Sequence, residues 1–309
     1  MRICSLLPSA TEIVAELGLI DSLVGVSEEC RWPPEVVGKP VVTAARIDPS
    51  SLSNLEIDAA VRASLVDGGS LYAVDADLIA ELDPDLIITQ DLCSVCAVSS
   101  TELTDACPVG AEVVSLDPCT LGEVAGSVRL LGERLGAVAE GERIAAQMLA
   151  SIEETATFVQ GCSPRPVFFA EWLDPPFCAG HWVPEMIERA GGRDVVGVAA
   201  TPSRSLTWDE AMGYEPELVV LGPCGFGAEE AAERAAGLEL GRPTVAVDGD
   251  SYFSRPAPRL AEGVRQLAHL FHPEMAPDAG LPTIWLEGGP SDARPGPASL
   301  STSSGPTAP

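Results

Sequence analysis

Apolar and polar positions are arranged along the chain in a way that predicts alternating helices and strands. The clearest unit is Asp75–Cys96, in which residues 75–82 place leucine and isoleucine on one helical face. Pro84 ends this helix, and Leu86–Thr89 follows as an apolar strand of the kind that is buried on both faces of a parallel sheet. The segment 90–96 then lies beyond the carboxyl end of the strand, where open α/β sheets bind their ligands.

The same order of signals returns ~130 residues later, which is the kind of internal repetition that indicates a duplicated structural unit. An acidic-proline-acidic turn at Glu215–Glu217 leads into the apolar strand Leu218–Leu221, as residues 83–85 lead into the first one. We therefore expect an α/β protein with two lobes of similar build, each with a central parallel sheet.

The remaining periodicity completes this prediction. Ser9 and Glu12 have the spacing of a capping box at the start of the first helix. Further strands are predicted at residues 2–6, 23–26, 41–42, 112–115, 167–170 and 244–247, and helices at residues 10–17, 55–65, 183–190, 208–212, 228–236 and 257–271.

The longest helical pattern covers residues 121–158, and Gly136 either kinks it or splits it in two. As one helix it would be over ~45 Å long, so we interpret it as a rod that bridges the lobes. The predicted organisation is an N-terminal lobe at 1–118, a connecting long helix at 119–160, a C-terminal lobe at 161–275 and a disordered tail at 276–309. The tail is rich in Pro, Gly, Ser and Thr, although its residues 283–286 are apolar enough to dock elsewhere.

Composition narrows the function classes. The net charge is -28 and Lys39 is the only lysine, which argues against binding to nucleic acid or to an anionic membrane surface. No run of 18 apolar residues predicts membrane insertion. The N-terminus reads as a strand rather than a secretory signal, and the nine cysteines are an odd number. These features predict a cytoplasmic protein with mostly free thiols.

Several segments carry a family resemblance. They are RICSLLPSATE at 2–12, VGVS at 24–27, PDLII at 84–88, the Gly191-Gly192 pair after a helix, and ELVV at 217–220. In these segments the chain resembles the substrate-binding proteins of cobalamin and iron-siderophore importers, over about residues 1–273, and the opening segment looks most like the cobalamin branch. The resemblance implies two α/β lobes joined by a rigid helix, with the ligand in the cleft between them. It also implies an ABC transporter partner, against which the apparent lack of an export signal argues.

On that fold, the loops after the strands line the cleft and supply the ligand-binding candidates. Large aromatic side chains suit a planar or bulky ligand such as a corrin ring, and an arginine suits a ligand carboxylate or phosphate. Packing between the lobes, and pairing of the arginine with nearby acids, are the alternative explanations. The candidates are Ser9, Trp32, Gln90, Asp91, Trp172, Phe177, Trp182, Tyr252, Phe253 and Arg255.

A second set of residues suits a metal. Cys93 and Cys96 form a CxxC pair, which can share a zinc or iron ion, form a disulfide or remain structural thiols. Cys30 and His181 are the candidates to complete a four-ligand site across the cleft. His181 opens a helix, and only three histidines occur in the chain, so we expect it to contact a ligand or metal.

Three functions remain open from the sequence. The first is a cytoplasmic binding protein that holds a corrinoid, cobalamin or a similar metal-bearing small molecule between the lobes. The second is a metal-dependent enzyme on the same scaffold, with Glu171 as a possible general base. The third is an interaction protein that recruits a partner through its acidic surface and its tail.

Overall fold

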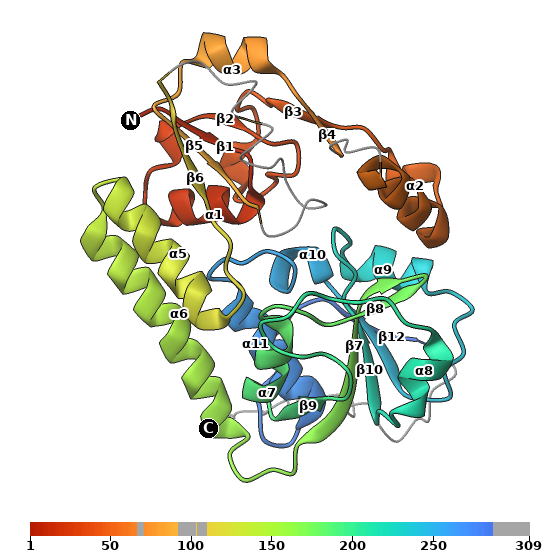
Figure 1. The fold of residues 1–309 in the computed structure, drawn as a ribbon. Coiled ribbons are helices and arrows are strands. Elements are labelled where there is room, and N and C mark those ends of the chain that lie inside the picture. Colours follow the sequence, from red (N-terminus) through yellow and green to blue (C-terminus); the bar gives the residue numbers. More distant parts are fainter. Residues whose placement is uncertain (67–70, 92–102, 104–109, 287–309) are drawn as a thin grey trace, which may run out of the picture.

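The chain folds into two α/β lobes stacked one above the other and joined along one side by a pair of helices (Figure 1). The structure is a computed structural model, and it describes residues 1–66, 71–91, 103 and 110–286. Among these residues, no helix combines the length and the apolar character that crossing a membrane requires.

The first lobe is built on a four-stranded sheet in the order β2-β1-β5-β6, with every neighbouring pair parallel. Parallel strands covered by helices are buried on both faces, and all four residues of β5 are buried. The predicted strands at the amino terminus, at 23–26, at 86–89 and at 112–115 are confirmed. The strands are β1 (Ile3–Ser5), β2 (Leu23–Val26), β5 (Leu86–Thr89) and β6 (Glu112–Ser115).

Two helices accompany this sheet. Helix α1 (Pro8–Glu16) follows β1, and α3 (Ala76–Leu82) precedes β5. The side chain of Asp75 caps α3 by accepting a hydrogen bond from the backbone N–H of Leu78 at 2.9 Å. Single 3-10 turns lie at η1 (Ile20–Ser22) and η2 (Pro34–Val36). The helix predicted from the spacing of residues 75–82 is therefore present.

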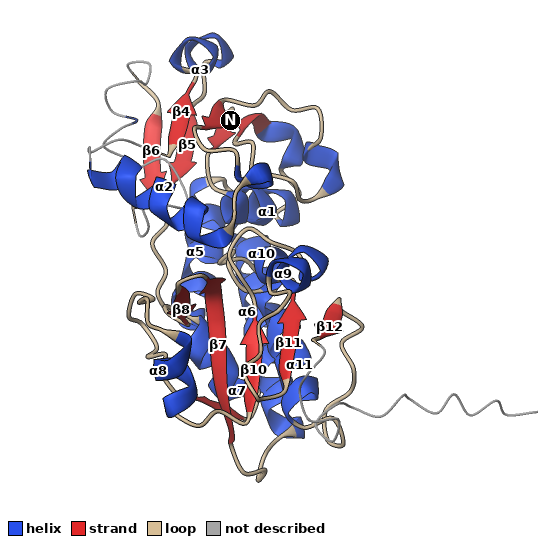
Figure 2. Cartoon of the chain, turned by 90° about the vertical axis from the view of Figure 1, so that its right-hand side faces the viewer, coloured by secondary structure: helices blue, strands red, loops and turns tan. Residues whose placement is uncertain are grey.

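Residues 43–66 and 71–74 project from the first lobe as a unit that we call the arm (Figures 1 and 2). Its strands β3 (Thr43–Ala45) and β4 (Tyr72–Val74) form an antiparallel sheet of their own. Between them lie the 3-10 turn η3 (Pro49–Ser51) and helix α2 (Asn54–Val66). The strand predicted at 41–42 is reduced to a single bridge between Val41 and Val26.

The segment between the lobes differs from the predicted single rod. Gly136 has a left-handed backbone (φ 72°), and the chain forms α5 (Leu121–Arg134) and α6 (Val138–Phe158) on either side of it. The two helices run side by side, and a Cβ placed on Gly132 would lie only 3.0 Å from the Cα of Gly141. The long helix between the lobes is α6, and Gly136 splits the predicted helix rather than kinking it.

Both helices of this pair belong to the hydrophobic cores of both lobes. In α5, Leu121 and Val124 pack in the core of the second lobe, whereas Val128 packs in that of the first. In α6, Ile144 packs in the first core and Met148 in the second. Each lobe is therefore fixed to two helices.

The second lobe has a six-stranded sheet in the order β12-β11-β10-β7-β8, with β9 also pairing with β7. The pairings of β7 with β9 and β10, and of β10 with β11, are parallel, whereas β8 and β12 are antiparallel. Its strands are β7 (Arg165–Leu173), β8 (Pro176–Cys178), β9 (Gly192–Asp194), β10 (Leu218–Leu221), β11 (Thr244–Val247) and β12 (Thr283–Trp285). Its helices are α7 (Val183–Arg189), α8 (Trp208–Gly213), α9 (Ala228–Arg234), α10 (Gly249–Tyr252) and α11 (Leu260–Phe271).

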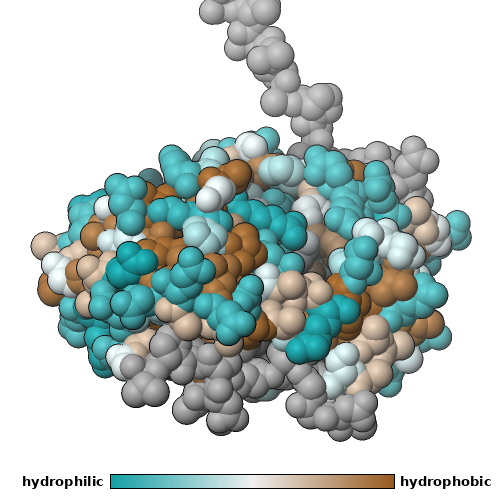
Figure 3. Space-filling view, turned by 90° about the horizontal axis from the view of Figure 1, so that it is seen from above, coloured by the Kyte–Doolittle hydropathy of each residue, from teal (hydrophilic) through white to brown (hydrophobic). Residues whose placement is uncertain are grey.

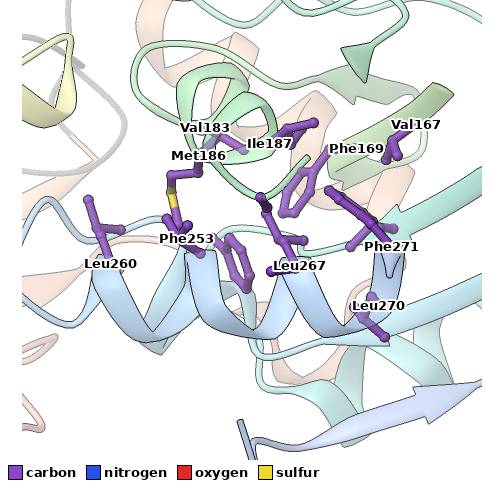
Figure 4. Close-up of a cluster of buried hydrophobic side chains, with 14 of the residues drawn as sticks. Val167, Phe169, Val183, Met186, Ile187, Phe253, Leu260, Leu267, Leu270 and Phe271 are labelled. Atoms are coloured by element: carbon purple, nitrogen blue, oxygen red, sulfur yellow. The ribbon is translucent and has the colours of Figure 1, made fainter. Parts of the chain in front are cut away.

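Alternate residues of β7 face opposite layers of this lobe, as the period of a strand requires. Phe169 packs in the core formed with α7 and α11, and Phe168 packs in the core formed with α8 and α9. Figure 4 shows Phe169 and Phe253 among the apolar side chains of α7 and α11, including Met186 and Leu267. The sheet is thus covered on both faces.

The tail predicted to be disordered from residue 276 is ordered at its start. Residues 276–286 are described, and β12 adds an antiparallel edge strand to β11, with Ile284 opposite Ala246. The apolar run 283–286, predicted to be able to dock elsewhere, therefore docks on the second lobe, whereas the prediction of disorder is wrong for residues 276–286. Residues 287–309 lie outside the described part of the chain.

Candidate ligand site between the two lobes

The segments that follow the carboxyl ends of several strands meet the opposite lobe. In Figure 1, α1 lies at the lower end of the first lobe, and α10 lies at the upper end of the second. Helix α1 follows β1, and α10 follows β11. This is the part of an open α/β sheet where ligands bind. The residues that join the lobes here fall into two groups.

The first group is a buried set of charged residues that we call the clamp, formed by Glu12, Asp250, Arg255 and Arg259. The carboxylate of Glu12 in the first lobe accepts hydrogen bonds from Nε and Nη2 of Arg259 at 2.9 and 2.5 Å. Arg255 lies 3.6 Å from Glu12 and donates to both carboxylate oxygens of Asp250 at 3.1 and 2.7 Å. The clamp therefore pairs two carboxylates with two guanidinium groups across the lobes.

Glu12 is only 1 % exposed. Burial raises the pKa of Glu12, and the hydrogen bond and charge of Arg259 oppose this increase. Removing one partner from a buried ion pair typically costs about 3–5 kcal/mol, because the other charge stays buried without compensation. The stability of the contact between the lobes therefore depends strongly on a few charged side chains.

The predicted capping box at the start of α1 is wrong, because Glu12 pairs with the second lobe instead of capping the helix. The N-cap residue is Leu7, and no side chain caps the helix. Glu12 lies in the middle of α1 and turns to the second lobe. Ser9 is buried, and within the described residues its hydroxyl has no hydrogen-bond partner. The Ser-x-x-Glu spacing matched a local motif, whereas the real partner of Glu12 is 247 positions away.

Two predicted aromatic residues flank the clamp. The guanidinium carbon of Arg259 lies 4.8 Å from the ring centre of Trp32 and 5.5 Å from that of Tyr252, both within cation–π range. Trp32 belongs to the first lobe and is 43 % exposed, and Tyr252 ends α10 in the second lobe. The structure thus brings together Trp32, Tyr252 and Arg255, three of the predicted candidates.

The second group joins the arm to the second lobe. Arg234 donates to the backbone oxygens of Pro49 and Leu52 at 3.2 and 3.1 Å and to the side chain of Asn54 at 3.3 Å. The indole N–H of Trp172 donates to the backbone oxygen of Asn54 at 3.3 Å.

The predicted aromatic residues Trp172 and Phe177 lie on this side of the interface. The Trp172 ring is 5.5 Å from that of Phe226. The guanidinium carbon of Arg62, on α2 of the arm, is 5.9 Å from the ring centre of Phe177. Both predicted residues therefore belong to the contact between the second lobe and the arm.

Two other predicted aromatic residues are part of the core instead. Trp182 is 6 % exposed, and its indole N–H donates to the backbone oxygen of Phe253 at 2.7 Å. The Phe253 ring packs 5.1 Å from that of Phe169 (Figure 4). Their place in the interior of the second lobe removes both from the candidate ligand surface.

Gln90 and Asp91 lie directly after β5, as expected. Gln90 is buried, and the backbone N–H of Asp91 donates to the side chain of Asp117 at 2.5 Å. Asp117 thus ties the start of this loop to the segment after β6. The loop continues with Cys93 and Cys96, which lie outside the described residues.

The proposed metal site gains no support from the residues that can be placed. Cys30 is buried, and its sulfur accepts a hydrogen bond from the hydroxyl of Thr11 at 3.0 Å. Burial raises the pKa of the Cys30 thiol, which disfavours the thiolate that binds metals. In the described part of the chain, no three His, Cys, Asp or Glu side chains are grouped so that they could hold a metal ion.

His181 has a left-handed backbone (φ 50°), which is uncommon for a residue other than glycine. Its N–H donates to the backbone oxygen of Thr201 at 2.7 Å, and its oxygen accepts from Ala200 at 2.9 Å. Partial burial lowers the pKa of its imidazole, so the ring is neutral near pH 7. The ring lies 5.7 Å from that of Trp182.

Glu171 has a structural role that weakens the enzyme hypothesis. One carboxylate oxygen accepts the N–H of Gly180 at 2.9 Å, and the other accepts the hydroxyl of Ser203. These bonds join the loop after β8 to the segment before α8. A carboxylate used in this way is poorly placed to act as a general base.

The sequence failed to identify Glu12, Arg259, Arg234, Asn54 and Phe226. Arg259 was recoverable in part, because it lies in the same Arg-Pro-Ala-Pro-Arg segment as Arg255. The other residues have no local signature, since each acts through a partner that is distant in sequence.

Two α/β lobes on a helical connection, with charged and aromatic side chains at their facing ends, define a two-lobed binding protein. Residues 3–246 match the family model described as "Periplasmic binding protein". The chain belongs to this family.

Curated relatives extend over nearly the whole chain. A vitamin B12-binding protein of Vibrio cholerae is 24% identical over 282 residues, which cover 86% of this chain and 87% of the relative. An uncharacterized ABC transporter substrate-binding lipoprotein of Bacillus subtilis is 26% identical over 285 residues, which cover 88% of this chain and 80% of the relative. The resemblance to substrate-binding proteins of importers is thereby confirmed.

Solved structures agree on the fold. The periplasmic heme-binding protein RhuT from Roseiflexus sp. RS-1 in its apo form matches with a TM-score of 0.64 and 22% identity, covering 88% of this chain and 98% of that one. The cytoplasmic location predicted from the sequence is wrong. The family is periplasmic by description, and one relative is named a lipoprotein, which points to an extracytoplasmic location.

Proposed function

We propose that this protein is the extracytoplasmic substrate-binding component of an ABC importer and that it binds a corrinoid such as cobalamin between its lobes. The observation that carries the proposal is the meeting of Trp32 and Tyr252, from opposite lobes, around Arg259. Flat apolar rings beside a guanidinium suit a large macrocycle that has polar substituents at its edge. The vitamin B12-binding relative from Vibrio cholerae supports the choice of ligand.

The site has a second aromatic group on its other side. Trp172 lies on the second lobe opposite the arm, and the buried ring of Phe226 supports it from below. We expect a ligand of the size of a large macrocycle to contact both aromatic groups at once. Corrinoids and hemes are of this size class, and heme is therefore the competing ligand in the experiment below.

His181 is the residue that would contact the metal of such a ligand. Its ring is half-buried and neutral near pH 7, which is the state in which imidazole binds a metal. Zinc or iron held by the protein alone is not part of this proposal, since the ligand would supply the metal.

The test is a titration of the purified protein with cyanocobalamin, followed by absorption spectroscopy and calorimetry. We expect stoichiometric binding, and we expect Trp32→Ala and Tyr252→Ala each to weaken the affinity by about tenfold or more, which corresponds to about 1.4 kcal/mol. Tyr214→Ala is the matched control. Tyr214 is an exposed aromatic residue that precedes β10, at the end of the sheet away from the first lobe.

A parallel titration with hemin separates the two tetrapyrroles. Binding of hemin without cyanocobalamin would replace the corrinoid by heme as the ligand. Binding of neither would overturn the proposal, and equal affinities for Trp32→Ala and wild type would remove the aromatic contact from it.

A further inference from the structure

Part of the arm is loosely built. Its two-stranded sheet is anchored, because Tyr72 and Val74 of β4 pack against a core cluster of the first lobe, so the loosely held part is η3 and α2. Among the described side chains of α2, Ile57 is the buried one, and Leu55 is 53 % exposed. An element with so few buried apolar groups separates from its surroundings more easily than a core helix does.

Polar contacts join this arm to the second lobe. The two terminal nitrogens of Arg234 reach the backbone oxygens of Pro49 and Leu52, and Asn54 both accepts from Arg234 and donates to its backbone oxygen at 3.4 Å. These acceptors are neutral. Water can replace such bonds when the arm lifts, so no charge is left buried without a partner.

Aromatic side chains of the second lobe lie next to this contact. Arg234 is 4.2 Å from the ring centre of Phe226, which is the neighbour of Trp172. Arg62 of the arm is near Phe177. In Figure 2 the arm helix α2 lies in front of the junction between the lobes, above β8. The arm therefore borders the aromatic surface assigned above to the ligand.

Both edges of the interlobe region are bridged in this structure, one by the buried clamp and the other by the arm. A bulky ligand enters only when one of these bridges opens. Opening at the clamp separates Glu12 from the oppositely charged Arg255 and Arg259 of the other lobe. Opening at the arm exchanges only neutral acceptors for water, because Arg234 keeps its ion pair with Glu230 on the same helix. The arm is the edge that opens.

We propose that the arm is a lid over the ligand site and that Arg234 is the positioning residue that holds it closed. This inference rests on the proposed function, because it assigns an entrance to the same site. Residues 67–70, which lie outside the described part of the chain, carry none of it.

The experiment compares Arg234→Ala and Arg234→Lys with wild type. Association and dissociation rate constants for cyanocobalamin, or for hemin if that is the ligand bound, are measured by stopped-flow tryptophan fluorescence. Arg234→Ala removes the guanidinium group that bonds several oxygens of the arm at once. We expect it to raise both the association and the dissociation rate constant by about tenfold, with a change in Kd of about threefold or less. Lysine keeps the charge but not the guanidinium group, so its rate constants should fall in between.

Arg189→Ala is the matched control. Arg189 forms an ion pair with Glu153 on the surface and makes no contact with the arm among the described residues. Its rate constants should equal those of wild type. If both rate constants of Arg234→Ala stay within about twofold of wild type, or if only dissociation becomes faster, the lid is overturned.

Amide hydrogen exchange of the ligand-free protein provides a readout that does not depend on ligand identity. Arg234→Ala should speed exchange in residues 54–64 and leave β10 unchanged. If wild type binds neither tetrapyrrole, the proposed function fails. The exchange rates of residues 54–64 then still decide whether the arm opens. Equal exchange of residues 54–64 in wild type and Arg234→Ala would then overturn the arm as a mobile element.

Discussion

The clamp and the arm contact both join the two lobes, yet they rely on different chemistry. In the clamp, the fully buried Glu12 of the first lobe is compensated by Arg255 and Arg259 of the second, so opposite charges pair across the interface. In the arm contact, Arg234 is paired with Glu230 on its own helix, and it reaches the arm only through the neutral oxygens of Pro49, Leu52 and Asn54. The first arrangement is costly to break and suits a permanent junction, whereas the second exchanges readily with water and suits an opening one.

Removing the carboxylate charge of the clamp should have the largest effect. Glu12→Gln leaves Arg259 and Arg255 buried with only Asp250 to compensate them. We expect the free energy of unfolding to fall by about 3–5 kcal/mol, measured by urea denaturation at pH 7. Glu142→Gln is the control, because Glu142 pairs with Arg129 at the surface and should cost about 0.5 kcal/mol or less. A loss similar to this control would show that the clamp behaves as a surface pair.

Asp194 is a buried carboxylate that has no arginine partner among the described residues. Comparing it with Glu12 separates the free-energy cost of burying a carboxylate from the stabilisation that an arginine provides. Asp194 accepts the N–H groups of Val196 and Gly197 through one oxygen, and its other oxygen has no partner in the described part of the chain. Burial raises the pKa of Asp194 from 3.8 to about 6. The folded state therefore holds this proton more tightly, and the stability gained is complete below pH ~4 and is lost as the pH rises through 6.

The expected loss across that window is on the order of 3 kcal/mol, since each pKa unit corresponds to about 1.4 kcal/mol. Asp194→Asn should remove the decline between pH 4 and pH 7, as followed by urea denaturation at several pH values. Parallel pH profiles for the variant and for wild type would contradict the raised pKa. Glu142→Gln serves again as the variant whose profile should follow that of wild type.

The smallest effect on stability is expected at the arm. Arg234→Ala should lower the free energy of unfolding by about 1–2 kcal/mol, because its acceptors can bind water instead. The same urea denaturation measures it, with Arg189→Ala as the surface control. A loss as large as that of Glu12→Gln would make the two contacts equivalent and would remove the contrast between them.

Strands and amphipathic helices could be predicted because their signals are local. The apolar run 218–221 and the helical spacing of 257–271 match β10 and most of α11. The helix predicted at 208–212 is present as α8, and the structure adds a capping box formed by Thr207 and Glu210 at its start. In each case the residues that decide the structure lie within a few positions of one another.

The candidate site depends on residues that are distant in sequence. Glu12 fitted a capping motif so well that its pairing with Arg259 could not be inferred. Trp182 and Phe253 occur in segments that look like loops, and only packing against Phe169 shows that they are interior. The strand at 283–285 needed its partner β11 to be recognised. The positions of these residues depend on burial and on pairing with partners that are distant in sequence, and local periodicity carries no information about either.

Seen from above, hydrophilic and hydrophobic residues are interspersed over the first lobe and the adjoining helices (Figure 3). This mixed surface and the net charge of -28 give no local signature of a transporter contact. The acidic interaction hypothesis accordingly remains a prediction, and its test is deletion of residues 276–309, which includes β12.

The close approach of Gly132 and Gly141 has a mechanical consequence. It lets α5 and α6 pack closely along their lengths, and two closely packed helices resist bending and twisting more strongly than one helix does. Both helices contribute side chains to both hydrophobic cores, so any force that moves one lobe relative to the other acts on both helices. The spacing of the lobes is therefore set by the scaffold, and a ligand meets a site whose two walls are already in place.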